Sequence, residues 1–279
     1  MEMNKAEHVQ MKESDSLERK VAAMSVLLEA HAPLVVAYSG GVDSAYLLAQ
    51  GHRILGRGML GVIADSASLP RQALADALAL ARSLGAEVEV VKTGELDNPE
   101  YAANPVNRCY FCKAELFTRL DELARGRGFR AIAYGENADD LRSVRPGRLA
   151  AEEFSVLAPL KEAGLGKEEI RALSRRLGLP TADAPAQPCL SSRIPHGTPV
   201  TVDALAMVEK GEAFLRGLGF RVFRVRHMVQ QGGGATARVQ VALEEMGRLE
   251  GLQEGVLGAG LATAGYAAVE IDPAGYRVS

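Results

Sequence analysis

From Leu34 onward, short apolar strands alternate repeatedly with helices, and this alternation leaves few possible folds. Strands are predicted in LVVAYS, MLGVIAD, VEVVKT and AIAYGEN, and helical patterns lie between them. Because strands with continuous apolar sequence are buried on both faces, helices must cover both sides of their sheet. The pattern therefore predicts an α/β fold with a doubly wound parallel sheet, whose ligands bind at the carboxyl ends of the strands.

A second, smaller domain is expected after this sheet. The segment LPTADAPAQPCLSSRIPHGTP is rich in proline and small polar residues, so it must be irregular. Beyond it, a helix, two β-rich runs joined by QQGGGA, another helix and a last strand predict a small α+β domain. We expect a disordered N-terminus at 1–15, a large domain at 16–185 and the smaller domain at 186–279. The first helix is expected to begin with a cap at Asp15 and to end near His31.

The bulk composition excludes several classes of protein. Charged residues make up 24% and hydrophobic residues 47%, which is typical of a folded chain and not of a disordered one. Apolar runs stop well short of the roughly 18 residues that span a bilayer, so no membrane segment or signal peptide is expected. A net charge of -3 gives no general attraction to nucleic acid, and no nucleic-acid partner is expected. The three cysteines then predict reduced thiols and a cytoplasmic location.

A glycine-rich turn connects the first strand to the following helix. It consists of Ser39, Gly40, Gly41, Val42, Asp43 and Ser44. Glycines allow the backbone to approach a phosphate closely, and the N–H groups at a helix N-terminus attract anions. Asp43 would repel phosphate unless it binds Mg²⁺, which prefers carboxylate and phosphate oxygens. The turn therefore predicts a site for phosphate and Mg²⁺, and the alternative is a strand-to-helix turn without a ligand.

The spacing of the three cysteines suggests a shared site. Cys109 and Cys112 lie three residues apart at the start of a predicted helix, so they share a face near its positive end. Cys189 lies in the irregular proline-rich segment, which can bring it to the same place. Three interpretations stay open: separate small core residues, a zinc site completed by His196 or His227, or a three-cysteine [4Fe–4S] cluster. Such a cluster leaves one iron open for an additional sulfide.

The string SGGVDS resembles the PP-loop of the ATP pyrophosphatases, which include GMP synthetases, NAD synthetases and tRNA thiolases. It differs from the Walker motif because no lysine follows its last glycine. The resemblance implies that the loop binds ATP, that a substrate is adenylated and that pyrophosphate leaves. The loop would stabilise the negative charge that grows on the pyrophosphate.

Five further motifs are specific enough to indicate one branch of that superfamily. They are ADSASLPRQ, NPVNRCYFCK, GENADDLRSVRPG, APLKEAGLGKEEIR and PCLSSRIPHGTPVT. They resemble the LarE family, the ATP-dependent sulfur transferases that help to build the nickel-pincer cofactor of lactate racemase. The resemblance runs with gaps from about Leu34 to Val241. It implies that a carboxylate of pyridinium-3,5-dicarboxylate mononucleotide, derived from nicotinate, is adenylated and then converted to a thiocarboxylate with sulfide or another sulfur donor.

The resemblance also implies roles for individual residues. Cys189 matches the sulfur-bearing cysteine of the family. Members with this cysteine alone give up its own sulfur, whereas members that also have CxxC, here Cys109 and Cys112, resemble cluster enzymes that turn over repeatedly. Arg193 and Arg145 lie in matched motifs and are expected to bind a carboxylate or phosphate of the substrate. The catalytic residues expected here are therefore Cys189 and Arg193.

Two further predictions for site residues and two departures from the family pattern bear on this assignment. Ser66, at the end of the second strand, is expected to contact the nucleotide, and Asp139 and Asp140 either bind a metal or cap a turn. The segment ADAPAQPC lacks the lysine expected before its Pro-Ala pair, and HMVQQGGGATARVQV is longer than the usual turn. These departures concern the substrate contacts more than the chemistry.

Several other functions remain as alternatives. They are a PP-loop tRNA thiolase, a sulfur transferase that sacrifices its own cysteine without a cluster, an ammonia-using ligase and a nucleotide-binding module without activity. A tRNA thiolase would have a basic RNA-binding face and salt-sensitive binding.

We expect the protein to form a homo-oligomer.

Overall fold

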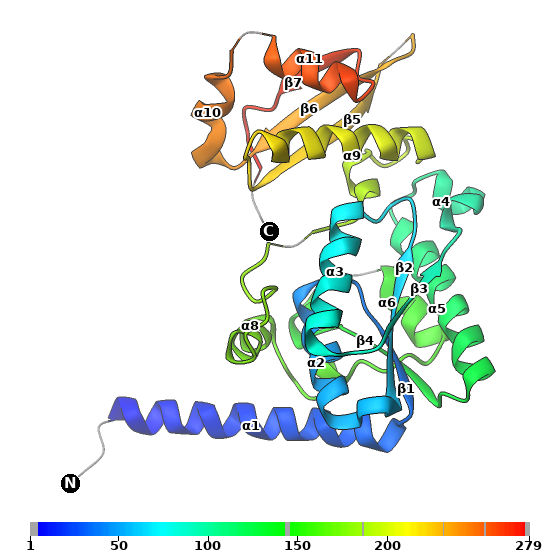
Figure 1. Ribbon diagram of the computed structural model, residues 1–279, viewed down its shortest axis with the longest axis vertical. Coiled ribbons are helices and arrows are strands. Elements are labelled where there is room, and N and C mark those ends of the chain that lie inside the picture. Colours follow the sequence, from blue (N-terminus) through cyan, green and yellow to red (C-terminus); the bar gives the residue numbers. More distant parts are fainter. Residues whose placement is uncertain (1–4, 143–145, 186, 231, 254, 277–279) are drawn as a thin grey trace. The chain divides into compact units, whose positions relative to one another are not determined.

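The computed structural model describes residues 5–142, 146–185, 187–230, 232–253 and 255–276 (Figure 1). The chain forms two compact units, each built from segments that are separate in sequence. The first unit comprises Met1–Asp65, Arg71–Thr93 and Cys112–Ala184, and the second comprises Ser66–Pro70, Gly94–Phe111 and Pro185–Ser279. The second unit therefore takes up two segments that the sequence analysis assigns to one continuous domain at 16–185.

The first unit is built on a parallel four-stranded sheet in the order β3-β2-β1-β4. The strands are β1 Leu34–Ala37, β2 Met59–Asp65, β3 Val88–Lys92 and β4 Ala131–Tyr134. In the register of the central strand, Leu34 pairs with Met59 on one side and Ala131 on the other. All four residues of β1 are buried, as expected for a central parallel strand. The sheet confirms the predicted α/β fold class.

Seven helices of the described residues accompany this sheet, and the beginning of one of them belongs to the second unit. They are α1 Lys5–His31, α2 Val42–Leu55, α3 Arg71–Leu84, α5 Arg108–Arg127, α6 Pro146–Glu153, α7 Pro159–Glu162 and α8 Lys167–Arg176. Helix α2 is the most deeply packed, with an unbroken run of buried residues from Ser44 to Gly51. It contacts β1, β2, α1 and α8, so its N-terminus is held rigidly at the carboxyl edge of the sheet.

Helix α1 begins at Lys5, well before the cap that the sequence predicts at Asp15. It therefore includes residues 5–15, which the sequence analysis assigns to a disordered N-terminus. The segment KAEHVQMKES consists mostly of residues that favour helices and contains no glycine or proline, so the helix can extend through it. Farther along, Leu17, Met24 and Leu28 are buried at helical spacing, and this apolar stripe holds α1 against the unit.

The second unit contains a three-stranded sheet in the order β5-β6-β7. Its main elements are α4 Pro99–Ala102, α9 Val202–Gly217, β5 Phe223–Val229, β6 Ala235–Val241, α10 Met246–Glu250, α11 Val256–Thr263 and β7 Ala268–Ile271. Strand β6 alternates between buried and half-buried residues, because one of its faces packs on the core formed with Leu215, Leu261 and Tyr266. The small α+β domain predicted after the proline-rich segment is thus present.

The two inserted segments belong to the second unit because main-chain hydrogen bonds tie them to the segment around Cys189. The amide of Leu190 donates to the carbonyl oxygen of Ser68 at 2.8 Å, and that of Val200 donates to Ala102 at 2.8 Å. Such contacts are distant in sequence, so the strand and helix pattern alone does not reveal them. No helix in the described part of the chain is long and apolar enough to cross a membrane.

Candidate functional site

The loop predicted to bind phosphate leads directly from β1 into α2. The hydroxyl oxygens of Ser39 and Ser44 lie 3.1 Å apart, and Ser44 also donates to the carbonyl oxygen of Gly41 at 3.0 Å. The N-cap of α2 is Gly41, which has no side chain to occupy the first amide groups of the helix. The loop can therefore offer amide and hydroxyl donors to an anion at the positive end of α2.

Two glycines allow close packing around this loop. Gly40 has a φ of +79°, and a Cβ there would lie 2.9 Å from the Cβ of Ala77. At Gly135, which follows β4, a Cβ would lie 2.7 Å from the backbone nitrogen of Ser44. A side chain at either position would have to push back α3 or the first turn of α2. The glycines therefore bring three segments of the first unit together around the loop.

Asp43 is paired with a lysine that the sequence analysis did not single out. The Nζ atom of Lys167, at the start of α8, lies 2.8 Å from Oδ2 of Asp43, and Asn137 donates to the same oxygen at 3.3 Å. The other carboxylate oxygen, Oδ1, is buried and has no hydrogen-bond partner among the described residues. A buried carboxylate oxygen without a partner is costly, so a cation at Oδ1 would be stabilising. The donor chemistry fits Mg²⁺.

Asp139 and Asp140 satisfy backbone amide groups. Oδ2 of Asp139 accepts a hydrogen bond from the amide of Lys167 at 2.7 Å, at the first residue of α8. Oδ2 of Asp140 accepts one from the amide of Asn137 at 3.2 Å. Of the two roles left open by the sequence, these contacts correspond to the capping of a turn and a helix. Asp139 thereby fixes the start of α8, and with it the position of Lys167.

Glu136, a buried carboxylate that follows β4, forms ion pairs with basic side chains. It accepts a hydrogen bond from Tyr134 at 2.6 Å and one from Nε of Arg148 at 2.9 Å, and Nζ of Lys161 lies 2.8 Å away. Burial acts to raise the pKa of Glu136, but the hydrogen bonds from Lys161, Tyr134 and Arg148 outweigh it and lower the pKa to about 2. Lys113 lies 4.6 Å above the Tyr134 ring. Two cations thus pair with one ionised carboxylate at the carboxyl edge of the sheet, and a third lies over the neighbouring Tyr134 ring, an arrangement that suits an anionic ligand.

Cys109 and Cys112 lie near the start of α5, as the sequence predicts. Cys109 is exposed and Cys112 is half-buried, and neither forms a disulfide. Residues three apart on a helix lie on the same face, so the two side chains lie one turn apart. Within the ranges that the structure describes, no group of three or more His, Cys, Asp or Glu side chains is placed to hold a metal ion. The cluster therefore stays a prediction.

Cys189 lies in the second unit, directly before a 3₁₀ turn at Leu190–Arg193, and it is a half-buried free thiol. Nη1 of Arg193 donates to the carbonyl oxygens of Pro188 at 2.6 Å and of Cys189 at 3.0 Å. The amide of Leu190 is held by Ser68 on the other side. Main-chain contacts therefore fix the segment that carries the thiol.

Arg193 is itself held by Glu212 of α9 in a buried, two-pronged ion pair. Nε donates to Oε1 at 2.8 Å and Nη2 to Oε2 at 2.9 Å, and the two side chains are only 3% and 6% exposed. The guanidinium group is thus engaged by Glu212 and by the main chain around Cys189. In the structure, Arg193 holds the main chain around Cys189 in position. Its binding of substrate stays a prediction.

Breaking this ion pair is expected to destabilise the protein strongly. Arg193→Met would leave Glu212 buried without its partner, so we expect the free energy of unfolding to fall by about 3 to 5 kcal/mol in urea denaturation. The double variant Arg193→Met/Glu212→Leu removes both charges and should recover much of the loss. Arg119→Gln, which breaks an exposed pair with Glu115, is the control and should change stability by less than about 1 kcal/mol. A similarly small effect for Arg193→Met would contradict the positioning role.

Buried polar side chains join residues 94–111 to the Cys189 segment. Nδ2 of Asn104 donates to the carbonyl oxygens of Pro195 and Thr198, both at 2.8 Å. Arg108 donates to the carbonyl oxygen of Ser191 at 3.0 Å, and the hydroxyl groups of Tyr101 and Ser191 are 2.7 Å apart. The sequence analysis placed Asn104 and Arg108 in a matched motif but gave them no role, since their partners lie far along the chain.

Two further predicted site residues have different outcomes. The hydroxyl oxygen of Ser66 lies 2.8 Å from that of Ser68, which donates to the buried Glu95 at 2.9 Å. Ser66 is therefore part of a polar network that follows β2, and its contact with a nucleotide stays a prediction. Arg145 lies outside the described residues.

Among the residues that sequence reasoning missed, Lys167 had one available signal, its position directly after the Gly-Leu-Gly of a matched motif.

No protein-family model matches the chain. An uncharacterized protein of Synechocystis is 47% identical over 192 residues, which cover 69% of this chain and 72% of that protein. The pyridinium-3,5-bisthiocarboxylic acid mononucleotide synthase of Lactiplantibacillus plantarum is 34% identical over 212 residues, which cover 76% of this chain and 77% of the synthase. A glutamine-hydrolyzing GMP synthase of Thermomicrobium roseum is 30% identical over 209 residues, 66% of this chain but only 39% of that protein.

Proposed function

The chain belongs to the LarE family, that of the pyridinium-3,5-bisthiocarboxylic acid mononucleotide synthase, and we propose that it uses ATP to convert a carboxylate of pyridinium-3,5-dicarboxylate mononucleotide to a thiocarboxylate. The observation that carries this proposal is the loop at the start of α2, in which a buried carboxylate oxygen of Asp43 lacks a partner among the described residues. A carboxylate inside an anion-binding turn is favourable when a cation accompanies the anion.

The loop would bind the phosphates of ATP through the hydroxyl groups of Ser39 and Ser44 and the first amide groups of α2. Mg²⁺ held at Oδ1 of Asp43 would neutralise charge on the phosphate oxygens. Lys167, already at the loop, would add positive charge beside the pyrophosphate as it leaves. An oxygen of the substrate carboxylate attacks the α-phosphorus, the bond to the β-phosphate breaks, and an acyl adenylate and pyrophosphate result.

The substrate carries carboxylates and a phosphate, so it needs cations for binding. We assign part of this role to Arg148 and Lys161, which Glu136 holds in place. Because the hydrogen bonds of Glu136 keep its pKa at about 2, the carboxylate stays ionised and the pair stays oriented at neutral pH. Lys113, above the Tyr134 ring, would add a third cation. Arg145 and Arg193 remain candidates for the same role.

The sulfur step would take place at Cys189. A sulfur nucleophile attacks the carbonyl carbon of the acyl adenylate, the carbon–oxygen bond to the phosphate breaks, and AMP leaves. We propose that Cys109, Cys112 and Cys189 hold a [4Fe–4S] cluster, which would supply sulfur from outside the polypeptide and let each chain act repeatedly. In the alternative without a cluster, the thiolate of Cys189 is itself the nucleophile. We propose a homo-oligomer as the working form.

A direct assay tests the reaction. The full-length protein, prepared without oxygen, is incubated with ATP, Mg²⁺, sulfide and the dicarboxylate mononucleotide, and pyrophosphate and products are quantified. We expect pyrophosphate release to depend on the mononucleotide, and the product mass to show one oxygen replaced by sulfur. Unfractionated tRNA is the parallel substrate. Pyrophosphate release with tRNA or ammonia, and none with the mononucleotide, would overturn the proposal.

A further inference from the structure

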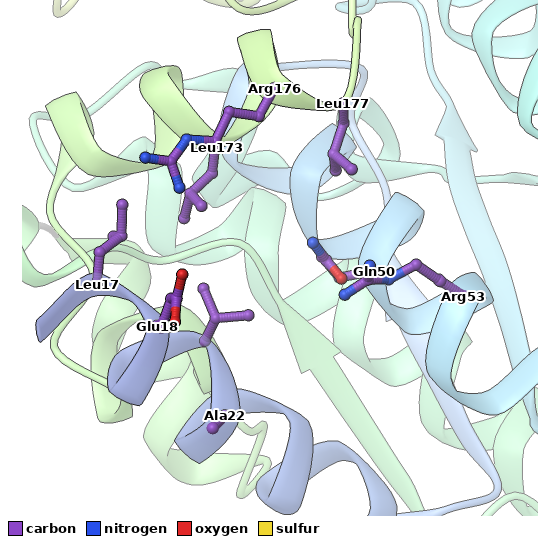
Figure 2. Close-up of a pocket in the computed structure, with 9 residues that line it drawn as sticks. Leu17, Glu18, Ala22, Gln50, Arg53, Leu173, Arg176 and Leu177 are labelled. Carbon is purple, nitrogen blue, oxygen red and sulfur yellow. The ribbon is translucent and has the colours of Figure 1, made fainter. Parts of the chain in front are cut away.

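A cavity of about 390 Å³ lies between helices α1, α2 and α8 of the first unit (Figure 2). Its volume is at the lower end of the range of roughly 300 to 1,000 Å³ that is typical of small-molecule sites. The cavity lies beside the second half of α2, at Gln50 and Arg53, and therefore well along the helix from Asp43. At 1.5 Å per residue, Gln50 is about 10 Å from Asp43 along the axis. It is thus separate from the phosphate loop.

The inner wall of the cavity contains a polar group that lacks a partner. Gln50 is only 3% exposed, and its Nε2 atom donates to the hydroxyl of Tyr46 at 3.2 Å. Its Oε1 atom is buried and accepts no hydrogen bond from any residue that the structure describes. Figure 2 shows the Gln50 side chain pointing into the space between the three helices. Because an unsatisfied buried carbonyl oxygen is costly, a ligand that donates an N–H or O–H group here would be stabilised.

The outer wall carries charge of both signs. Arg53 of α2, Arg176 of α8 and Glu18 of α1 line the cavity, and none of them forms an ion pair within the described part of the chain. Between the charged groups lie the apolar side chains of Leu17 and Leu173, which are 9% and 7% exposed. The cavity therefore offers two guanidinium donors, a carboxylate and an amide oxygen as acceptors, and an aliphatic wall.

We propose that this cavity binds a small zwitterion with an apolar body, of the class of the aliphatic α-amino acids. The ligand carboxylate would bind Arg53 and Arg176, and its ammonium group would donate to Gln50 Oε1 and Glu18. The aliphatic side chain would pack against Leu17 and Leu173. A ligand with only an anionic group would leave Gln50 Oε1 without a donor, and one with only a cationic group would leave both arginines unpaired.

The position of the cavity also gives it a route to the phosphate loop. Helix α2 begins at the loop, and α8 begins at Lys167, which holds Asp43. A ligand between the later turns of these helices would bias the contact between their first turns, so it would change the affinity for ATP. This consequence rests on the proposed function, whereas binding of the ligand does not.

Isothermal titration of the full-length protein with L-leucine, without nucleotide, tests the binding. We expect saturable binding, and we expect leucinamide, which lacks the carboxylate, and 4-methylpentanoate, which lacks the ammonium group, to bind at least about tenfold more weakly. Arg53→Gln/Arg176→Gln and Glu18→Gln should each weaken leucine binding by about tenfold or more. Arg19→Gln, an exposed change beside Glu18 on the same helix, is the matched control and should bind like the parent protein.

Three outcomes would overturn the proposal. They are no saturable binding of leucine, equal binding of 4-methylpentanoate, and leucine binding that is unchanged in both cavity variants. All of these variants alter exposed residues, so each is expected to fold like the parent protein. Thermal denaturation before titration checks this. Because the titration contains neither ATP nor a sulfur acceptor, failure here leaves the proposed reaction standing, and failure of the reaction leaves this result intact.

Discussion

Asp43→Asn is expected to abolish ATP-dependent pyrophosphate release, with a fall of at least about 10²- to 10³-fold, the effect typical of losing one key electrostatic group. Asparagine has nearly the same shape as aspartate but no charge, so it would hold Mg²⁺ much more weakly at the position of Oδ1. It also loses the ion pair in which Oδ2 lies 2.8 Å from Nζ of Lys167. The measurement is pyrophosphate release at saturating ATP and mononucleotide.

The control for this substitution is Asp121→Asn, which neutralises an aspartate that pairs with Arg125 on the surface of α5. Its release of pyrophosphate should match that of the parent protein, because surface pairs contribute little. Thermal denaturation of both variants separates a loss of chemistry from a loss of folding. Unchanged release by well-folded Asp43→Asn would contradict the assignment of a PP-loop.

Cys189→Ala is expected to eliminate the thiocarboxylate product while the acyl adenylate and pyrophosphate still form. The thiol lies in a segment that is fixed by main-chain contacts, so removing its sulfur should leave the fold unchanged. Cys109→Ala and Cys112→Ala should each remove the visible absorption of an iron–sulfur centre and repeated turnover, and leave ATP binding intact. Product is measured by mass spectrometry under single and multiple turnover. Full activity of both CxxC variants would show that these cysteines are only structural.

Mass spectrometry of the protein after turnover distinguishes the two sources of sulfur. If Cys189 is the nucleophile, its Cβ–S bond then breaks as a proton leaves Cα, and dehydroalanine remains. The chain would lose the mass of H₂S and act once. If the sulfur comes from a cluster, the chain keeps its mass. We expect the intact chain, and dehydroalanine at position 189 in iron-loaded protein would contradict the cluster.

The parallel sheet and the loop predicted to bind phosphate follow from local sequence. A run such as LVVAYS must be buried on both faces, and two glycines before a helical pattern place a turn at the end of that strand. These signals involve neighbouring residues, so they can be recognised without knowledge of the fold. The alternation of buried and half-buried residues in β6 is of the same kind.

The partners of the site residues could not be predicted in this way. Lys167 reaches Asp43 across 124 positions of the chain, and no periodic pattern joins them. From the sequence, Arg193 is expected to bind a carboxylate or phosphate of the substrate, but Glu212 on α9 accepts hydrogen bonds from two of its donors. Both pairings depend on where helices pack, and packing is decided by long-range contacts that local propensity does not record.

The ion pair between Lys167 and Asp43 has a consequence for selectivity in a cell rich in inorganic phosphate. With the charge of Lys167 already balanced by Asp43, a bare phosphate ion that enters the loop meets little net positive charge and one nearby carboxylate. An anion that arrives with its own divalent cation would bring a partner for Oδ1 of Asp43, which has none among the described residues, and would release Lys167 toward the phosphates. The loop would therefore select anions that carry a bound divalent cation, and free phosphate would compete poorly with the metal complex of the nucleotide.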